Sequence, residues 1–168
     1  MFIQPLPIYI GFGSMSMMNN HHKIGGIVIE ALKKSGKRGI ISGFGKPNNL
    51  TNNIFAVDSI PHTWLFKHVA AVCHHGGAGT SAAGFSAGVP SIIIPFSNDQ
   101  FAWAHRSYEL GIGVKPLYMK DLNVDDLAER IALAYDPNLQ KKAKEIGEKI
   151  QAEQGAKECA NIIIDILP

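Results

Sequence analysis

The stretch AAVCHHGGAGTSAAGFSAGVPSIIIPFSNDQ, residues 70–100, decides the fold of this chain. It opens with the apolar run Ala70–Cys73, passes through two histidines and a glycine-rich turn, and enters the alanine-rich segment Gly79–Ala87. A glycine and a proline end that segment, and the β-branched run Ser91–Ile94 follows. A strand, a helix and a second strand in this order predict a parallel βαβ unit, because parallel neighbours need a crossover that is usually a helix.

The same alternation of short apolar runs and helical patterns extends through the rest of the chain. The expected strands are Ile8–Gly11, Gly39–Ser42, Ile54–Val57, Ala70–Cys73, Ser91–Ile94 and Ile112–Lys115. The expected helices are Asn20–Lys34, Pro61–Lys67, Gly79–Ala87, Asp99–Leu110, two that begin at Asn123 and Asp136, and the amphipathic tail Ala156–Leu167. The sequence therefore predicts one α/β domain over residues 1–168, with a Rossmann-like parallel sheet flanked by helices and a helical C-terminal tail.

Composition excludes several classes of protein. The 168 residues are 46% hydrophobic and 18% charged, which is typical of a folded domain with a core. The formal net charge of +2 comes from scattered basic and acidic residues, so we expect no nucleic-acid partner. Cys73 and Cys159 suit reduced thiols better than a disulfide framework. Because we find neither an apolar run of about 20 residues nor a signal-peptide pattern, we expect a cytoplasmic location.

Four loops of unusual composition follow the expected strands. They are Gly11–Ser16, Asp58–His62, His74–Thr80 and Pro95–Gln100. Ligands of open α/β sheets bind beyond the carboxyl ends of the strands, where these four loops meet. In the third loop, glycines at a helix start let backbone N–H groups approach an anion that the helix dipole favours, as in a diphosphate site.

Two other interpretations compete for this third loop. A metal site is disfavoured because His74 and His75 are neighbours on a strand, where side chains point to opposite faces. A plain tight turn, with the histidines as satisfied polar groups near the core, stays open on the residues alone.

The motifs of these loops resemble those of a known family. Together they are similar to the nucleotide-sugar-binding domain of GT-B glycosyltransferases, and look most like the sterol 3-beta-glucosyltransferases and their bacterial antibiotic-glycosylating relatives. The motifs that carry the resemblance are Gly11–Met15, Ile60–Phe66, His74–Thr80, Ala87–Pro90, Pro95-Phe96 and Asp99-Gln100. They extend over residues 8–115, about two thirds of the chain.

The resemblance implies a domain that binds UDP-glucose or a related UDP-sugar without a metal or other cofactor. Diphosphate contacts are implied for His75, Gly77, Gly79 and Thr80. Gly13 and Ser14 match the first loop, which is implied to close on the nucleotide from the other side. Asp99 and Gln100 match the pair that hydrogen-bonds the sugar hydroxyls, since a carboxylate accepts and an amide both donates and accepts. Asp99 also stands where a helix N-cap is expected, and both roles are compatible.

Two positions depart from the plant small-molecule branch of the same superfamily. Ser59 stands where that branch stacks a tryptophan on the uracil, and Ala83 stands where it holds the ribose with a glutamate. We therefore expect uracil recognition through the backbone near Ile60. Trp64 does not fill this gap by its sequence position. Its place beside Leu65 and Phe66 in a short helix predicts a core residue.

Enzymes of this family have two Rossmann-like domains, with the acceptor site and usually the catalytic base in the first. The chain matches the second domain alone, so the resemblance implies donor binding here and no catalytic residue within these 168 residues. Expected partners are an N-terminal acceptor domain or partner chain and a lipid or sterol acceptor, with the full enzyme peripheral at a membrane. The implied reaction is direct displacement at the anomeric carbon by an acceptor hydroxyl that a base activates.

Two alternatives from other classes remain. A separate donor-binding subunit of a two-chain glycosyltransferase would bind the same ligand and be inactive alone. A redox dinucleotide-binding domain would need the G-x-G-x-x-G fingerprint. That alternative is weak, because Gly11 and Gly13 are followed by Ser16 instead of the third glycine.

Overall fold

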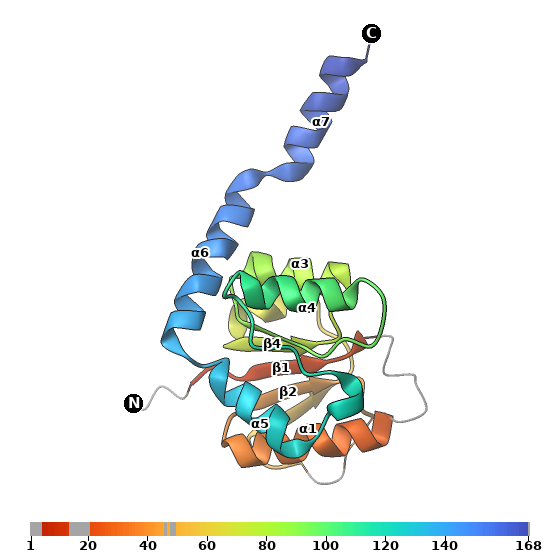
Figure 1. Cartoon of the computed structure of the whole chain (residues 1–168), viewed down its shortest axis with the longest axis vertical. Coiled ribbons are helices and arrows are strands. Elements are labelled where there is room, and N and C mark those ends of the chain that lie inside the picture. Colours follow the sequence, from red (N-terminus) through yellow and green to blue (C-terminus); the bar gives the residue numbers. More distant parts are fainter. Residues whose placement is uncertain (1–4, 14–20, 46, 48–49, 168) are drawn as a thin grey trace.

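The computed structural model describes residues 5–13, 21–45, 47 and 50–167. A five-stranded sheet forms its centre, with every strand parallel to its neighbours and the order β3-β2-β1-β4-β5. The strands are β1 (Ile8–Gly11), β2 (Gly39–Ser42), β3 (Ile54–Val57), β4 (Ala71–His74) and β5 (Ser91–Ile93). The predicted fold class, a Rossmann-like parallel sheet flanked by helices, is confirmed (Figure 1).

Helices cover both faces of this sheet. The longer ones are α1 (His21–Ser35), α3 (Ala78–Ala87), α4 (Gln100–Glu109), α5 (Val124–Leu133), α6 (Pro137–Glu153) and α7 (Gly155–Ile166). The short elements are α2 (His62–Leu65) and the 3-10 turns η2 (Phe66–His68) and η3 (Met119–Asp121). α1 packs against α5 below the sheet in Figure 1, and α3 lies beside α4 above it.

The core is apolar on both sides of the sheet because successive strand residues point to opposite faces. Ile8 and Ile10 of β1 are fully buried in the cluster that also contains Leu32 of α1 and Leu127 of α5. Tyr9 points to the other face and packs with residues of α2, η2 and β4. The all-apolar strands of the sequence are thus explained by helices on each side.

The C-terminal helices leave the body of the domain. α6 packs against α3, and α7 continues outward beyond it (Figure 1). Gln154 separates the two helices with a left-handed φ of 47°. Every residue of α7 is exposed, including Ile164 at 67%. Among the described helices, none combines the length and apolarity that a membrane span requires.

The two cysteines lie in opposite environments. Cys73 is fully buried on β4, and burial raises the pKa of its thiol. Cys159 is exposed on α7, and both thiols are free. In the described residues the two thiols are therefore far apart in environment and unpaired with each other.

Two details of the predicted fold are wrong. The expected strand Ile112–Lys115 contributes only an isolated parallel bridge between Gly113 and Ser91, because Pro116 follows at once and has no N–H for a ladder. Trp64 is 57% exposed instead of buried, since α2 is a single turn whose inner side is occupied by Leu65. The Trp64 ring instead lies 4.6 Å from the ring of His68.

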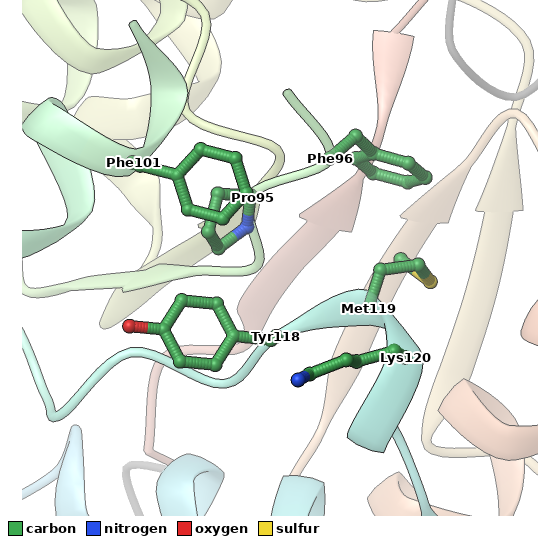
Figure 2. A pocket seen from close by; sticks show the side chains of 6 residues that line it. All are labelled: Pro95, Phe96, Phe101, Tyr118, Met119 and Lys120. Carbon is green, nitrogen blue, oxygen red and sulfur yellow. The ribbon is translucent and has the colours of Figure 1, made fainter. Parts of the chain in front are cut away.

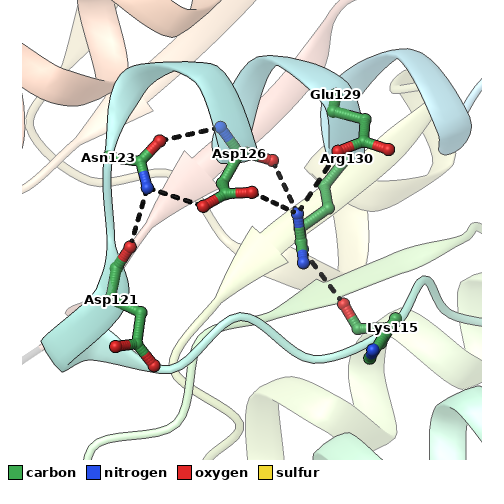
Figure 3. Close-up of polar contacts among 6 residues, drawn as sticks. All are labelled: Lys115, Asp121, Asn123, Asp126, Glu129 and Arg130. Carbon is green, nitrogen blue, oxygen red and sulfur yellow. Dashed lines mark hydrogen bonds and ion pairs between the residues drawn. The ribbon is translucent and has the colours of Figure 1, made fainter.

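Asn123 and Asp136, where two helices were expected to begin, both cap them, and Asn123 also anchors the segment before α5. Asn123 Oδ1 accepts the Asp126 N–H at 2.9 Å, and its Nδ2 donates to the Asp121 carbonyl at 3.0 Å (Figure 3). Arg130, only 14% exposed, donates through Nε to the Lys115 carbonyl at 3.2 Å. Asp136 accepts two N–H groups at the start of α6. The segment Lys115–Asn123 is therefore pinned at both ends.

The connection from β4 to α3 is fixed by the side chain of His74. This fully buried ring accepts the Gly76 N–H through Nδ1 at 3.0 Å. Gly76 has a φ of +92°, and a Cβ there would lie 2.7 Å from Cγ2 of Ile93, so the turn requires glycine. Burial lowers the pKa of His74 to about 3, and the neighbouring His75 and His62 add to the shift. His74 is therefore a neutral acceptor in the core.

Replacing His74 with Asn tests this arrangement through the pH dependence of stability. The unfolded chain binds a proton at His74 below about pH 6.5, whereas the folded chain does not until about pH 3. The free energy of unfolding therefore falls as the pH drops below 6.5, by up to about 1.4 kcal/mol per pH unit from this group. An asparagine oxygen can accept the Gly76 N–H without titrating. We expect a shallower fall in His74→Asn, measured by urea unfolding at several pH values.

His68→Asn, a change at an exposed position of η2, is the matched control and should keep the wild-type slope. Part of the slope will persist in His74→Asn, because burial also lowers the pKa of His62 and His75. A slope identical to that of the wild type would contradict a buried neutral imidazole at position 74.

A close approach of two glycines joins α6 to the end of α3. A Cβ at Gly147 would lie 2.5 Å from Cα of Gly88 and 2.7 Å from its N. We expect Gly147→Ala to lower the free energy of unfolding by about 1–3 kcal/mol, because backbone must move to admit the methyl group. At Gly26 of α1 no described atom lies within 4 Å of such a Cβ, so Gly26→Ala should stabilise by up to about 1 kcal/mol. Chemical denaturation measures both, and effects of the same sign would refute the proposed clash.

Candidate functional site

The loops that follow β1, β4 and β5 meet at the carboxyl edge of the sheet. These three strands are neighbours, with β1 paired to β4 and β4 paired to β5. The β4 loop also reaches the start of α4, because a Cβ at Gly76 would lie 3.2 Å from the Gln100 carbonyl oxygen. The predicted meeting of three of the loops is therefore found.

His75 lies at the centre of this edge. A Cβ at Gly13 would be 3.5 Å from Cε1 of His75, and one at Gly77 would be 2.6 Å from its Nε2. The ring thus stands between the loop after β1 and the glycine-rich loop after β4. Ser14, the other predicted residue of the first loop, lies outside the described residues.

The surroundings of His75 favour the neutral form of its ring, which can still donate a hydrogen bond to an anion. Burial lowers the pKa of His75, and the nearby carboxylate of Asp99 opposes the shift. Its Nδ1 is buried and has no hydrogen-bond partner among the described residues. A neutral imidazole at this place donates one N–H without carrying a buried charge.

The first turn of α3 presents free backbone donors beside His75. Gly77 is the N-cap and has no side chain, and the first turn contains no acidic residue. The N–H groups of Ala78, Gly79 and Thr80 have no carbonyl partner within the helix, as in any first turn. The first intrahelical bond is donated by Ser81 to the Gly77 carbonyl at 2.9 Å. Donors of this kind, together with the helix dipole, are suited to bind an anion.

Gly79 has no structural reason to be glycine. Its φ is not in the left-handed region, and no described atom lies within 4 Å of a Cβ at this position. An alanine there would also favour the helix. A bare backbone at this exposed place is typical of a ligand that comes within van der Waals distance.

Asp99 and Gln100 stand together at the start of α4 but differ in their environment. Asp99 is exposed at the N-cap position, yet its side chain makes no capping bond, so the predicted capping role is wrong. Its Oδ2 instead accepts from Nε1 of Trp103 at 3.2 Å. One carboxylate oxygen is thereby held in place while the residue faces solvent near His75.

Gln100 is buried and braces the loop before it. Its Oε1 accepts the N–H of Phe96 at 2.7 Å and that of Ser97 at 3.2 Å. The amide oxygen is therefore used by the protein, and only the NH₂ group can serve a ligand. The sequence predicted that this amide both donates to and accepts from a ligand. In the structure only its NH₂ group is available as a donor, because the oxygen is already bonded.

Ile60 belongs to a different cluster. It is half-buried before α2 and packs against the core residues around Tyr9 and Phe66. The contacts that join Gly13, Gly77 and Asp99 to His75 do not include it. The adjacent His62 stacks on Phe66 with ring centroids 4.6 Å apart.

Two residues of this region were missed by sequence reasoning. Trp103 holds Asp99, and a signal existed in their i,i+4 spacing on an expected helix. His74 holds the glycine-rich turn, and its position as the last residue of an apolar strand was the only hint. Within the part of the chain that the structure describes, no three His, Cys, Asp or Glu side chains group as metal ligands.

Known proteins similar to this chain agree on one family. The signature described as Erythromycin biosynthesis protein CIII-like, C-terminal domain, matches residues 42–166. The chain is 40% identical over 154 residues to sterol 3-beta-glucosyltransferase UGT80B1 of Arabidopsis thaliana, covering 89% of this chain and 25% of that protein. A sterol 3-beta-glucosyltransferase of Emericella nidulans is 38% identical over 160 residues, covering 88% of this chain and 11% of that protein. The chain thus spans about a quarter or less of these relatives.

Solved glycosyltransferase structures share the fold. The glycotransferase of kitacinnamycin superposes with a TM-score of 0.83 at 20% identity, covering 100% of this chain and 45% of that one. Glycosyltransferase VinC, solved in complex with dTDP, gives 0.76 at 21% identity, covering 96% of this chain and 42% of that one. These comparisons do not support the redox dinucleotide alternative or a separate donor-binding subunit.

The family signature covers the sheet from the end of β2 onward, together with the glycine-rich loop and both helices that carry the candidate residues. This chain therefore belongs to the erythromycin biosynthesis protein CIII-like C-terminal domain family and has the fold of the C-terminal half of a GT-B glycosyltransferase.

Proposed function

We propose that this chain is the donor-binding domain of a larger glycosyltransferase, which transfers glucose from UDP-glucose to a sterol or similar lipid hydroxyl. The observation that carries the proposal is the convergence of His75, the bare first turn of α3 and Asp99 at the carboxyl edge of the sheet. The names of the sterol 3-beta-glucosyltransferase relatives support the reaction and the acceptor class. The bound dTDP of VinC supports a nucleoside diphosphate ligand.

The diphosphate binds at the N-terminus of α3. Backbone N–H groups of Ala78, Gly79 and Thr80 donate to its oxygens, and Thr80 adds a hydroxyl. His75 donates from one side, and Gly13, just after β1, lies next to this ring. Fixed dipoles and a neutral imidazole stabilise the charge of the leaving diphosphate without a metal ion.

The sugar binds next to this diphosphate at the start of α4. The Asp99 carboxylate accepts hydrogen bonds from sugar hydroxyls, while the Gln100 NH₂ donates one. Trp103 keeps the carboxylate from rotating, because it holds Oδ2 at 3.2 Å. Orientation of the sugar is thereby set by side chains that the helix itself positions.

The reaction is a direct displacement. The acceptor oxygen forms a bond to the anomeric carbon while the bond from that carbon to the diphosphate oxygen breaks, and UDP leaves. The proton of the acceptor hydroxyl passes to a base that the rest of the enzyme supplies. The described residues contribute binding, orientation and charge stabilisation.

Calorimetric titration with UDP tests the anion site and its independence of metal. We expect saturable binding that EDTA leaves unchanged. Gly79→Ala should weaken binding by about tenfold or more, because a methyl group occupies the approach path of the phosphate. The same variant should fold normally and gain up to about 1 kcal/mol of stability from its higher helix propensity.

Gly26→Ala makes the same chemical change on α1 and should bind UDP like the wild type. Loss of binding in EDTA would sink the metal-free account. Unchanged UDP affinity in Gly79→Ala would contradict binding of the diphosphate at the N-terminus of α3.

A pair of variants separates diphosphate recognition from sugar recognition. His75→Ala should weaken UDP and UDP-glucose alike by roughly ten- to a hundredfold, because it removes a hydrogen bond to a charged group that is worth about 1.5–3 kcal/mol. Asp99→Ala should leave UDP binding nearly intact and reduce the extra affinity for UDP-glucose. Both are measured by the same titrations, with folding checked by circular dichroism.

Trp103→Phe is the control for Asp99→Ala, since it removes the same Asp99–Trp103 hydrogen bond but keeps the carboxylate. It should lose less selectivity for UDP-glucose than Asp99→Ala. If Asp99→Ala weakened UDP and UDP-glucose equally, Asp99 would serve the structure and not the sugar.

A further inference from the structure

A cavity of about 480 Å³ opens beside the sugar-binding pair and has no part in donor binding as described above. Its lining residues are Pro95, Phe96, Phe101, Tyr118, Met119 and Lys120. Figure 2 shows the rings of Phe101 and Tyr118 on one side of it and Phe96 with Met119 on the other. The volume lies within the range of about 300–1,000 Å³ that small-molecule pockets have.

The lining is suited to a flat apolar ligand. Three aromatic rings, a proline and a thioether form most of the wall. Phe101 is 38% exposed, and its ring centroid lies 5.8 Å from that of Tyr118. The polar groups of the side chains are the Tyr118 hydroxyl and the Lys120 ammonium. An apolar wall with a few polar groups is typical of a site that binds a hydrophobic small molecule.

The walls of this cavity are held by hydrogen bonds from other elements. The Tyr118 hydroxyl lies 3.1 Å from Nε2 of His105 on α4. Arg130 and Asn123 pin the two ends of the segment that carries Tyr118, Met119 and Lys120, at the Lys115 and Asp121 carbonyls (Figure 3). The cavity is therefore formed before any ligand arrives, which lowers the ordering cost of binding.

The cavity and the sugar-binding pair share one loop. Phe101 follows Gln100 directly, and the Phe96 N–H donates to Gln100 Oε1 at 2.7 Å. A ligand in the cavity thus lies next to the sugar of the donor. The nucleotide base is attached at the opposite end of the diphosphate, so it does not compete for this place.

We infer that this cavity is one wall of the acceptor site and receives the apolar ring system of the acceptor alcohol. The inference rests on the proposed function, in which a hydroxyl must approach the anomeric carbon beside Asp99. A fused-ring alcohol of the sterol class fits the aromatic lining, and its hydroxyl end points toward the sugar. Lys120 also lines the cavity and is exposed.

Energy transfer from Trp103 to the fluorescent sterol dehydroergosterol tests the inference. The chain with Trp64→Phe leaves Trp103 as the only tryptophan, and Trp64 is an exposed residue on α2. With UDP-glucose at saturation, we expect energy transfer that saturates with sterol concentration. Phe101→Ala should weaken sterol binding by about tenfold or more, as expected for the loss of a contacting aromatic ring, and should leave UDP binding unchanged.

Tyr108→Ala is the matched control, because it removes another exposed aromatic ring, 51% exposed, from the same helix. It should bind the sterol like the parent. Equal sterol affinity in Phe101→Ala and the parent would overturn the inference, and would indicate adhesion elsewhere, such as to the exposed isoleucines of α7. Absence of saturable transfer in a chain that binds UDP would also overturn it while leaving donor binding intact. Failure to bind UDP at all would instead contradict the proposed donor-binding function.

Discussion

The hydrogen bond from the Gly76 N–H to the buried Nδ1 of His74 is the constraint on which the site depends. It fixes the direction in which the chain leaves β4, and therefore where the first turn of α3 points. His75 is the first residue after β4, and its ring lies beside Gly13 and Gly77 at the carboxyl edge of the sheet. A neutral, buried acceptor thus orders the proposed anion site without placing a charge in the core.

Gln100 holds the loop after β5 through backbone hydrogen bonds, as His74 holds the loop after β4. Gln100 is a helix residue whose amide oxygen reaches back to two N–H groups of the preceding loop. Phe96, whose N–H this amide holds, lines the apolar cavity, while the neighbouring Asp99 is held by Trp103. The two loops touch where Gly76 meets the Gln100 backbone, so the polar and apolar parts of the edge form one unit.

Much of this fold could be predicted from the sequence because its strands are short apolar runs with clear helix signals between them. Asn123 and Asp136 identified helix starts through local chemistry, which needs no distant partner. Trp64 and the segment Ile112–Lys115 were misjudged, since their burial and pairing depend on neighbours that only the folded chain brings near. The candidate site residues Gly13, His75, Gly77, Asp99 and Gln100 were identified through motifs. The bracing roles of His74, Gln100 and Trp103 were not predicted, because each acts through a contact that residue type alone does not reveal.

Because one cysteine is buried and the other exposed, the two thiols should react with a reagent at very different rates. The thiolate is the form that reacts with alkylating reagents, and it is suppressed at Cys73 by complete burial between neighbouring strands. Cys159 on α7 remains open to solvent. A thiol reagent therefore modifies Cys159 in the folded chain at once, and Cys73 only when the sheet opens. The rate of the slower reaction measures how often the central strands open.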